Sequence, residues 1–368
     1  MLICFVFLSI QNNKVDFSES LNSDFNLEEK PVTNIAPLYQ IEWSRLDPNG
    51  DVCNSLELTS TEDIIIAGDA IYTNMISVVK YDKSGNLIWN QFYDGRGGGD
   101  MTLDSSNNIY LVGYELDSIS EDRDFLIYKL NSAGTILWTR TFDKNKYDYP
   151  TAVITDGYND VYIVGYTYLQ SNWENKDFMI VKYSSSGNFL WDRTLDIDAE
   201  DYGLSITTDL ANNIYIAGAT SPHGSMLEDY VAAKYDRYGN LQWSKRWGGY
   251  YDERANDIVT DSANNVYITG FEDTPSNHEE VSLFKLSGSN GAILWSRLWS
   301  GYGIDIGFSI DLDASNNIYI SGGTYEQSAG LYDILLLTYD SGGNFRWWGR
   351  WGGSRHDFGG AIAVDSSK

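Results

Sequence analysis

The stretch DSSNNIYLVG at residues 104–113 decides the fold, because the chain repeats it. It returns as DLANNIYIAG at 209–218, DSANNVYITG at 261–270 and DASNNIYISG at 313–322. A tryptophan closes each copy, and successive tryptophans lie 46, 49, 53, 52, 52 and 52 residues apart. Self-similarity at a nearly fixed period of this length indicates a repeat architecture. The tryptophans are Trp43, Trp89, Trp138, Trp191, Trp243, Trp295 and Trp347.

Each period contains four short runs with the character of β-strands. In the copy at 204–247 they read LSITTD, NNIYIAG, DYVAAKYD and NLQWSKRW, and Asp, Asn and Gly turns separate them. Four antiparallel strands in about 50 residues are typical of a β-propeller blade, so we predict an all-β propeller. One blade cannot bury both faces of its sheet, and we expect the seven tryptophans to pack between blades.

The two ends of the repeat array predict how the ring is made up. The array starts with a lone last-type strand, LYQIEWSRL at 38–46, and ends after a first-type strand, AIAVD at 361–365. We therefore predict six complete blades plus a partial seventh built from these two strands. The middle strands of that blade are missing, so we expect a propeller domain at 38–368, truncated at its C-terminus, after a leader at 1–37. A six-bladed ring with loose end strands is the alternative.

The repeat also resembles a known family. WGGYYDERANDIVTDSANNVYITGFED at 247–273 and WGGSRHDFGGAIAVDSSK at 351–368 are similar to the SBBP family of seven-bladed β-propeller repeats. The strands 124–129, 177–182 and 229–234, which run from Asp to Lys, match its consensus as well. The resemblance covers 38–368 and implies a propeller, but its consensus residues imply a scaffold and no activity. More distantly, the closing phrase is similar to the tryptophan-docking motif of quinoprotein propellers, without their adjacent cysteines.

Charge limits the partners that we expect. The chain has 52 acidic and 25 basic residues, a formal charge of −27. Nucleic acids and anionic membranes bind through Lys and Arg, so neither is an expected partner. The N-terminal run MLICFVFLSIQ is too short to span a bilayer but resembles the apolar part of a secretory signal. We therefore expect a secreted or cell-surface protein without an integral membrane segment; a packed or disordered N-terminal arm is the alternative.

Two sets of aspartates recur with the repeat. The links between blades carry the first set, which could bind Ca²⁺ as a carboxylate ring at a channel mouth, or cap turns and pair with basic residues. This set is Asp51, Asp148, Asp201, Asp252, Asp305 and Asp357. The second set opens Asp-x-x-Asn turns, and we expect it to cap them. This set is Asp104, Asp156, Asp209, Asp261, Asp313 and Asp365. Basic residues two positions after the tryptophans are expected to form inter-blade salt bridges, with capture of an anionic ligand as the alternative; they are Arg45, Arg140, Arg193, Lys245 and Arg297.

The links between second and third strands differ from blade to blade, as binding loops in repeat arrays do. Their aromatic residues could stack on sugars or anchor a protein, or have no function; they are Tyr168, Trp173, Tyr325 and Tyr332. Histidines are few, and no G-x-S-x-G motif occurs. We expect a monomeric, non-catalytic extracellular propeller that binds a protein or glycan through one loop-lined face. The alternatives are a glycan hydrolase or lyase with axial carboxylates, and a purely structural repeat.

Overall fold

The computed structural model describes residues 7–8 and 52–364, apart from 71–72, 74, 117–121, 145–146, 169–174, 223–224, 226, 276–277, 302, 327–330 and 353–355. Every regular element in these residues is a β-strand, so the all-β prediction is confirmed. No helix of this part of the chain is long and apolar enough to cross a membrane. The predicted strand at 38–46, with Trp43, lies outside the described residues, as do Asp51, Trp173 and Asp365.

The strands follow the four-strand period of the sequence. The first described strand is a two-residue strand, β1 (Phe7–Leu8). The next strands are β2 (Val52–Leu58), β3 (Ile64–Ala70), β4 (Met75–Tyr81), β5 (Leu87–Asp94), β6 (Arg96–Leu103), β7 (Ile109–Leu116), β8 (Arg123–Leu130), β9 (Ile136–Phe142), β10 (Asp148–Thr155), β11 (Val161–Tyr168), β12 (Lys176–Tyr183) and β13 (Phe189–Leu195). The remaining strands are β14 (Glu200–Thr208), β15 (Ile214–Ser221), β16 (Asp229–Tyr235), β17 (Leu241–Trp247), β18 (Glu253–Thr260), β19 (Asn265–Asp273), β20 (Glu279–Ser287), β21 (Ile293–Trp299), β22 (Asp305–Leu312), β23 (Ile318–Glu326), β24 (Leu331–Tyr339), β25 (Phe345–Trp351) and β26 (Ala363–Val364).

Consecutive strands pair antiparallel in groups of four, which we call units. The units β2–β5, β6–β9, β18–β21 and β22–β25 are separate four-stranded sheets. The same order of pairing recurs within β10–β13 and β14–β17, which a single parallel residue pair, Lys176 with Glu200, joins into one eight-stranded sheet. Strand β1 pairs in parallel with β26.

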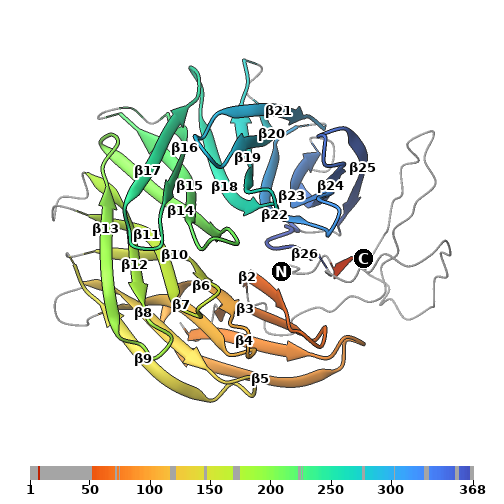
Figure 1. The fold of residues 1–368 in the computed structure, drawn as a ribbon. Coiled ribbons are helices and arrows are strands. Elements are labelled where there is room, and N and C mark those ends of the chain that lie inside the picture. Colours follow the sequence, from red (N-terminus) through yellow and green to blue (C-terminus); the bar gives the residue numbers. More distant parts are fainter. Residues whose placement is uncertain are drawn as a thin grey trace.

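The units are arranged as a β-propeller. Figure 1 shows them fanned around a common centre, with the first strand of each unit toward the middle and the fourth toward the outside. First strands of neighbouring units contact one another, from β2 with β6 to β18 with β22. Strand β26 contacts both β22 and β2. The propeller arrangement predicted from the repeat is therefore confirmed.

Side-chain burial follows this layering. Second and third strands lie between neighbouring sheets, and every residue of β15 is buried. Fourth strands expose one face, so Leu137 on β9 is 52% exposed while Trp138 beside it is partly buried. The Asp-x-x-Asn turns between first and second strands are capped as expected. Asp209, for example, accepts the backbone N–H of Ala211 and Asn213 at 2.9 and 2.8 Å.

A tryptophan packs at each seam between units. The ring of Trp138 lies 5.8 Å from that of Tyr110, and its indole N–H donates to the backbone carbonyl of Ser185 in the next unit at 3.3 Å. Gly187, in the same hairpin turn, has φ +79°, and a Cβ there would lie 3.1 Å from the indole. The turn therefore needs glycine both for its backbone conformation and for its close approach to the ring. Trp243 meets the following turn in the same way, through Gly288 O at 3.1 Å.

Among the described residues, the basic residues two positions after the tryptophans do not form the expected inter-blade salt bridges; Arg45 lies outside this part of the chain. Arg140, Arg193 and Arg297 instead donate from Nε to the carbonyl of the turn glycine in the next unit, at 2.6, 2.8 and 2.7 Å. Each guanidinium also lies 5.0–5.4 Å from the centre of its own tryptophan ring. The turn offers a backbone carbonyl where the sequence suggested a carboxylate, so the seam is closed by hydrogen bonding and cation–π contact.

Polar side chains connect the first strands near the centre. Asp257 accepts hydrogen bonds from the hydroxyls of Ser205 and Ser309 at 2.6 and 2.9 Å and from the backbone N–H of Ile310 at 2.8 Å. It therefore joins β14, β18 and β22. Asp311 accepts the N–H of Val364 at 2.6 Å, which attaches β26 to β22.

We expect Trp138→Ala to destabilise the protein by about 3 kcal/mol, because it removes a seam indole and leaves a cavity under the turn. Leu137→Ala, the adjacent and exposed position on β9, should change the free energy of unfolding by less than about 0.5 kcal/mol. Urea denaturation followed by circular dichroism measures both. Equal losses in the two variants would contradict the importance of the seam.

Candidate functional site

The acids of the links between units cap turns. Asp148, Asp201 and Asp305 are fully buried, and each accepts the backbone N–H four residues earlier, at 2.7, 2.8 and 2.5 Å. Asp148 also accepts the hydroxyl of Thr167 at 2.5 Å, and Asp201 that of Thr220. Asp357 is buried as well. These contacts favour the capping alternative over an open ring of carboxylates.

Asp252 does not occupy the position that the other linking acids share. Glu253 does: it is 2% exposed, begins β18, and accepts the backbone N–H of Gly249 at 3.0 Å. Asp252 instead accepts the N–H of Glu228 at 2.9 Å. Glu253 lies eight residues before Asp261, the spacing that the other linking acids keep, whereas Asp252 lies nine before it; this difference was the signal in the sequence.

A different set of carboxylates lies along the inner strands. Glu57, Asp100, Asp257 and Asp311 come from β2, β6, β18 and β22. Burial raises the pKa of Glu57 to about 8, with added repulsion from Asp100 and Asp311. Burial likewise raises the pKa of Asp100 and of Asp311 to about 7. Sequence reasoning missed these acids because they lack the regular spacing of the two aspartate sets.

Tyrosines from three consecutive units form a continuous surface that we call the tyrosine patch: Tyr114, Tyr149, Tyr166, Tyr168 and Tyr202. Tyr149 and Tyr166 stand opposite each other on β10 and β11 and stack with ring centres 5.1 Å apart. Tyr114 on β7 packs edge-on against Tyr149 at 5.4 Å, and Tyr202 on β14 against Tyr166 at 5.3 Å. The patch therefore crosses two seams.

The tyrosines of the patch differ in their exposure to solvent. Tyr114, Tyr149, Tyr166 and Tyr202 are partly exposed, whereas Tyr168 is 8% exposed and packs behind them. Tyr168, expected in a link between strands, is instead the last residue of β11, and its ring packs against Tyr149 and Tyr166. Burial raises the pKa of Tyr166 to about 12, so the hydroxyl stays protonated at neutral pH.

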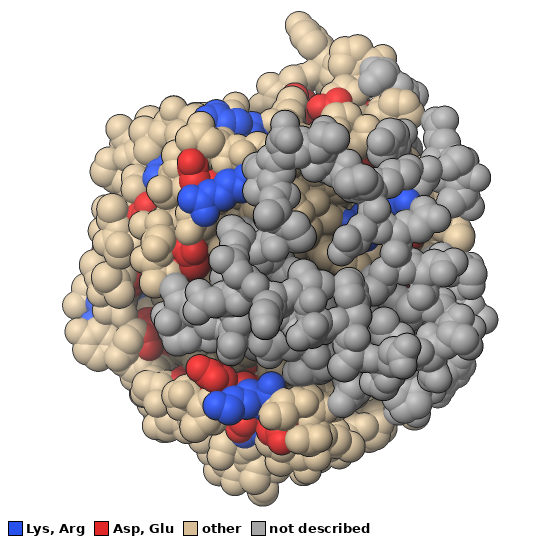
Figure 2. Space-filling view, turned by 90° about the vertical axis from the view of Figure 1, so that its right-hand side faces the viewer, with Lys and Arg blue, Asp and Glu red and all other residues tan. Residues whose placement is uncertain are grey.

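Two cations flank the tyrosine patch. Arg123 on β8 lies 5.3 and 4.9 Å from the ring centres of Tyr114 and Tyr149. Lys176 on β12 lies 4.4 Å from the centre of Tyr202 and pairs with Glu200 at 2.5 Å. The rings and cations hold one another in place, so the surface is preorganised. In the side view of Figure 2, described basic and acidic side chains likewise lie next to one another.

A cavity of about 440 Å³ lies next to Tyr114. Arg96, Tyr114, Glu115, Leu126 and Tyr128 are among its lining residues, so it combines aromatic, aliphatic and charged groups. It lies where β6 follows β5, at a seam between two units. The cavity and the tyrosine patch share Tyr114, so the two features adjoin each other.

Tyr325 and Tyr332 are brought together elsewhere, on β23 and β24. Their ring centres are 5.0 Å apart, and Phe358 lies 4.9 Å from Tyr332. The N–H of Tyr332 donates to Nδ1 of His356 at 3.1 Å. These residues form a second, smaller aromatic group. Sequence reasoning missed Tyr114, Tyr149, Tyr166 and Tyr202 because they lie within strands and not in the variable links. The recurrence of tyrosine in neighbouring repeats was the available signal.

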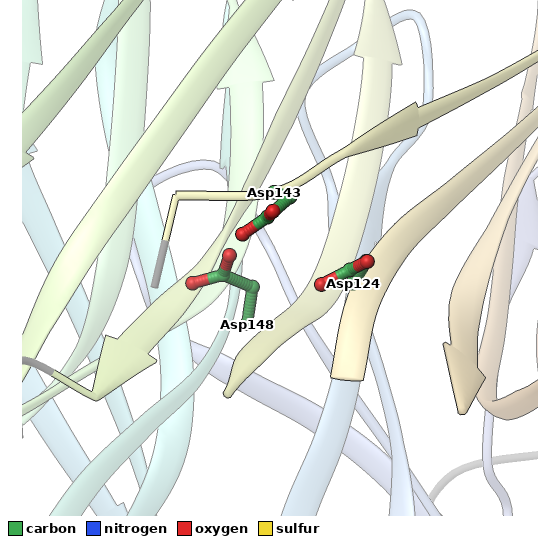
Figure 3. Close-up of side chains that lie close together, drawn as sticks. All are labelled: Asp124, Asp143 and Asp148. Atoms are coloured by element: carbon green, nitrogen blue, oxygen red, sulfur yellow. The ribbon is translucent and has the colours of Figure 1, made fainter. Parts of the chain in front are cut away.

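Two groups of three carboxylates could hold a metal ion. The first acid cluster is Asp124, Asp143 and Asp148; the second acid cluster is Asp177, Asp196 and Asp201. In each cluster one oxygen from every carboxylate lies within 4.8 Å of the others. Figure 3 shows the first cluster: Asp143, directly after β9, lies near Asp124 on β8 and Asp148 on β10.

Comparison with known proteins supports the fold more than the function. No family model matches the chain, so membership of the SBBP family stays a prediction. The chain is 24% identical over 216 residues to an uncharacterized WD repeat-containing protein, L264, of Acanthamoeba polyphaga mimivirus. That match covers 51% of this chain and 13% of the viral protein.

Solved structures are similar in fold. A protein of unknown function from Dyadobacter fermentans has a TM-score of 0.52 at 9% identity, covering 83% of this chain and 95% of its own. The Dos1 propeller has a TM-score of 0.50 at 13% identity, covering 87% of this chain and 83% of its own. At these identities the likeness shows a β-propeller fold and nothing further.

The inner carboxylates predict how stability depends on pH. Their folded pKa values lie above the unfolded values near 4, so the folded state binds more protons between about pH 4 and pH 8. The free energy of unfolding should therefore fall as pH rises through this window. We expect a lower Tm at pH 8 than at pH 5, measured by differential scanning calorimetry.

Glu57→Gln should raise Tm at pH 8 and reduce the pH dependence, because it removes one buried charge. Glu62→Gln, which changes an exposed carboxylate paired at 3.7 Å with exposed Lys83, should behave like the parent protein. A Tm that rises from pH 5 to pH 8, with the same slope in Glu57→Gln, would show that the inner acids are not desolvated.

Proposed function

We propose that this chain is a β-propeller scaffold that binds a protein partner through the tyrosine patch. The observation that carries the proposal is the row of partly exposed tyrosines across three units, held by mutual ring contacts between 5.1 and 5.4 Å. Tyr and Arg are enriched among residues that dominate binding energy at protein interfaces. The resemblance of part of the chain to a WD repeat-containing protein supports the same conclusion.

The framework suits this role because the patch loses little freedom on binding. Tyr149 and Tyr166 are opposite residues of paired strands, and Arg123 lies over Tyr149 at 4.9 Å. Immobilising side chains on binding costs about 0.5–1.5 kcal/mol each, and these side chains are already held in the free protein. The adjoining cavity beside Tyr114 offers a recess for one side chain of the partner.

A glycan is the second candidate partner. Pyranose rings stack on aromatic faces, and Glu200 accepts the hydroxyl of Tyr202 at 3.0 Å at the edge of the patch. A carboxylate beside a partly exposed ring provides an acceptor for sugar hydroxyls. An extracellular or cell-surface location is part of the proposal for either partner, supported by the apolar run at residues 2–10.

We further propose that the four-stranded units are six blades of a ring in which β26 marks a seventh. Three features support this count: β26 contacts β22 and β2, Val364 donates to Asp311 at 2.6 Å, and Ile362 packs with Tyr319 and Leu336. As the first strand of a seventh blade, β26 would lie between β22 and β2 and complete the series of first strands around the centre.

Binding through the tyrosine patch is tested by selecting ligands and then changing single tyrosines. The immobilised full chain is screened against a displayed protein-fragment library and a glycan array. For the ligands selected, Tyr149→Ala and Tyr202→Ala should each raise Kd at least tenfold, because each removes a large aromatic contact from the patch.

Tyr238→Ala is the matched control. Tyr238 is 68% exposed in the turn between β16 and β17, at the opposite end of the strands, and its loss should leave Kd unchanged. Ligands from the protein library alone would support a protein partner, and ligands from the array alone a glycan. Ligands whose affinity falls in Tyr238→Ala but not in the patch variants would contradict the proposal.

A further inference from the structure

The two acid clusters are copies of one arrangement. Each residue of the second cluster follows its counterpart in the first by 53 residues. In both, one aspartate lies within the first two residues of the third strand of a unit, one follows the fourth strand, and one lies within the first two residues of the first strand of the next unit. The clusters therefore bridge two successive seams, from β6–β9 to β10 and from β10–β13 to β14.

Two other units show how the same third-strand aspartate is neutralised elsewhere. Asp229 pairs with Nε of Arg246 at 2.6 Å, and Asp333 pairs with Nε of Arg350 at 3.2 Å. Each of these arginines is paired, across the strands, with the residue two positions after the aspartate. In the two units with acid clusters, the residues paired in the same way are Thr141 and Thr194. Gly248 and Gly352 follow the fourth strands where the clusters have Asp143 and Asp196.

Within one chain, then, two units combine arginine with glycine at these positions, and two units combine threonine with aspartate. In the first combination the aspartate has a built-in cation. In the second combination the cation is lost and a further carboxylate is gained, so three acids face one another. Such a change is expected where a bound cation replaces the guanidinium, because otherwise repulsion between the acids increases with no compensation.

Asp177 provides a separate observation. Its side chain is 6% exposed, and no hydrogen bond or ion pair to it exists among the described residues. Burial raises its pKa to about 6, with further repulsion from Asp196 and Asp201, while Lys144 lowers it. Lys144 itself pairs with Asp192 at 2.5 Å. A buried carboxylate without a partner is costly, and an oxygen of this one lies within 4.8 Å of oxygens of two other carboxylates.

We propose that each acid cluster binds one Ca²⁺ ion. The ligands in the first cluster would be Asp124, Asp143 and Asp148, and in the second Asp177, Asp196 and Asp201, with water completing the shell. Ca²⁺ fits because all the donors are oxygens and because its coordination is flexible. Turn amides hold Asp148 and Asp201 through hydrogen bonds of 2.7 and 2.8 Å, so one ligand of each site is fixed in advance.

A bound ion would attach each unit to the next. Arg246 has a comparable role, because it pairs with Asp229 in its own unit and with Asp198 across the preceding seam, the latter at 2.5 Å. Ca²⁺ should therefore stabilise the seams that lack this arginine. The proposal is independent of the partner that binds the tyrosine patch, since no residue is common to the patch and the clusters.

The test uses the full chain, stripped with a chelator and titrated with CaCl₂ in a calorimeter. We expect about two ions per chain and a rise in Tm on adding millimolar Ca²⁺. Asp124→Asn and Asp177→Asn should each lose one ion. Both variants should fold without Ca²⁺ at least as stably as the parent, because each removes a poorly compensated charge.

Thr194→Arg is the sharpest variant, because it copies the arrangement at Arg246 into the second cluster. It should lose one of the two ions, raise Tm in chelator, and reduce the further rise on adding Ca²⁺. Two results would overturn the proposal: no heat and no change in Tm for the parent at millimolar Ca²⁺, or unchanged binding in Asp124→Asn combined with Asp177→Asn.

Discussion

The structure depends on the contact between an indole on one unit and a glycine turn on the next. A four-stranded sheet of this size cannot bury both faces by itself, so its stability comes from its neighbours. Trp138 lies under the turn of Gly187, and Arg140 closes over it by donating to the carbonyl of that glycine. Repetition of this contact fixes the angle between units, and Asp257 and related side chains join the first strands near the centre.

Fixed seams explain why candidate binding features lie across units. Tyr114, Tyr166 and Tyr202 belong to three units, and they meet only because each seam holds its two sheets at a constant separation. The acid clusters also span seams, and there the chain uses two solutions to one electrostatic problem. Where Arg246 is present the third-strand aspartate is paired within the protein; where Thr141 or Thr194 replaces it, a neighbouring aspartate appears instead.

Features that repeat along the sequence could be predicted from it, whereas features that depend on contacts between units could not. The period, turn residues and tryptophans were enough for an all-β propeller, because each is set by local chemistry. Glu253 was missed in favour of Asp252 because the recurring acid is glutamate in this link, and an aspartate stands directly before it. The partners of Arg140 were predicted to be carboxylates, because a backbone carbonyl acceptor is present at every residue and so cannot be recognised from residue types. The tyrosine patch and the acid clusters join residues from separate periods, so only the arrangement of units reveals them.

The most direct test of the seam is the exchange of indole N–H protons with solvent, followed by NMR on protein labelled with ¹⁵N-tryptophan. In this structure Trp138 and Trp243 donate from the indole to carbonyls of the next unit, at 3.3 and 3.1 Å. Both signals, assigned by single Trp→Phe variants, should therefore exchange far more slowly than those of the unfolded chain. Exchange of both protons at the unfolded rate would contradict the account, because the indoles would then not be held beneath the adjoining turns.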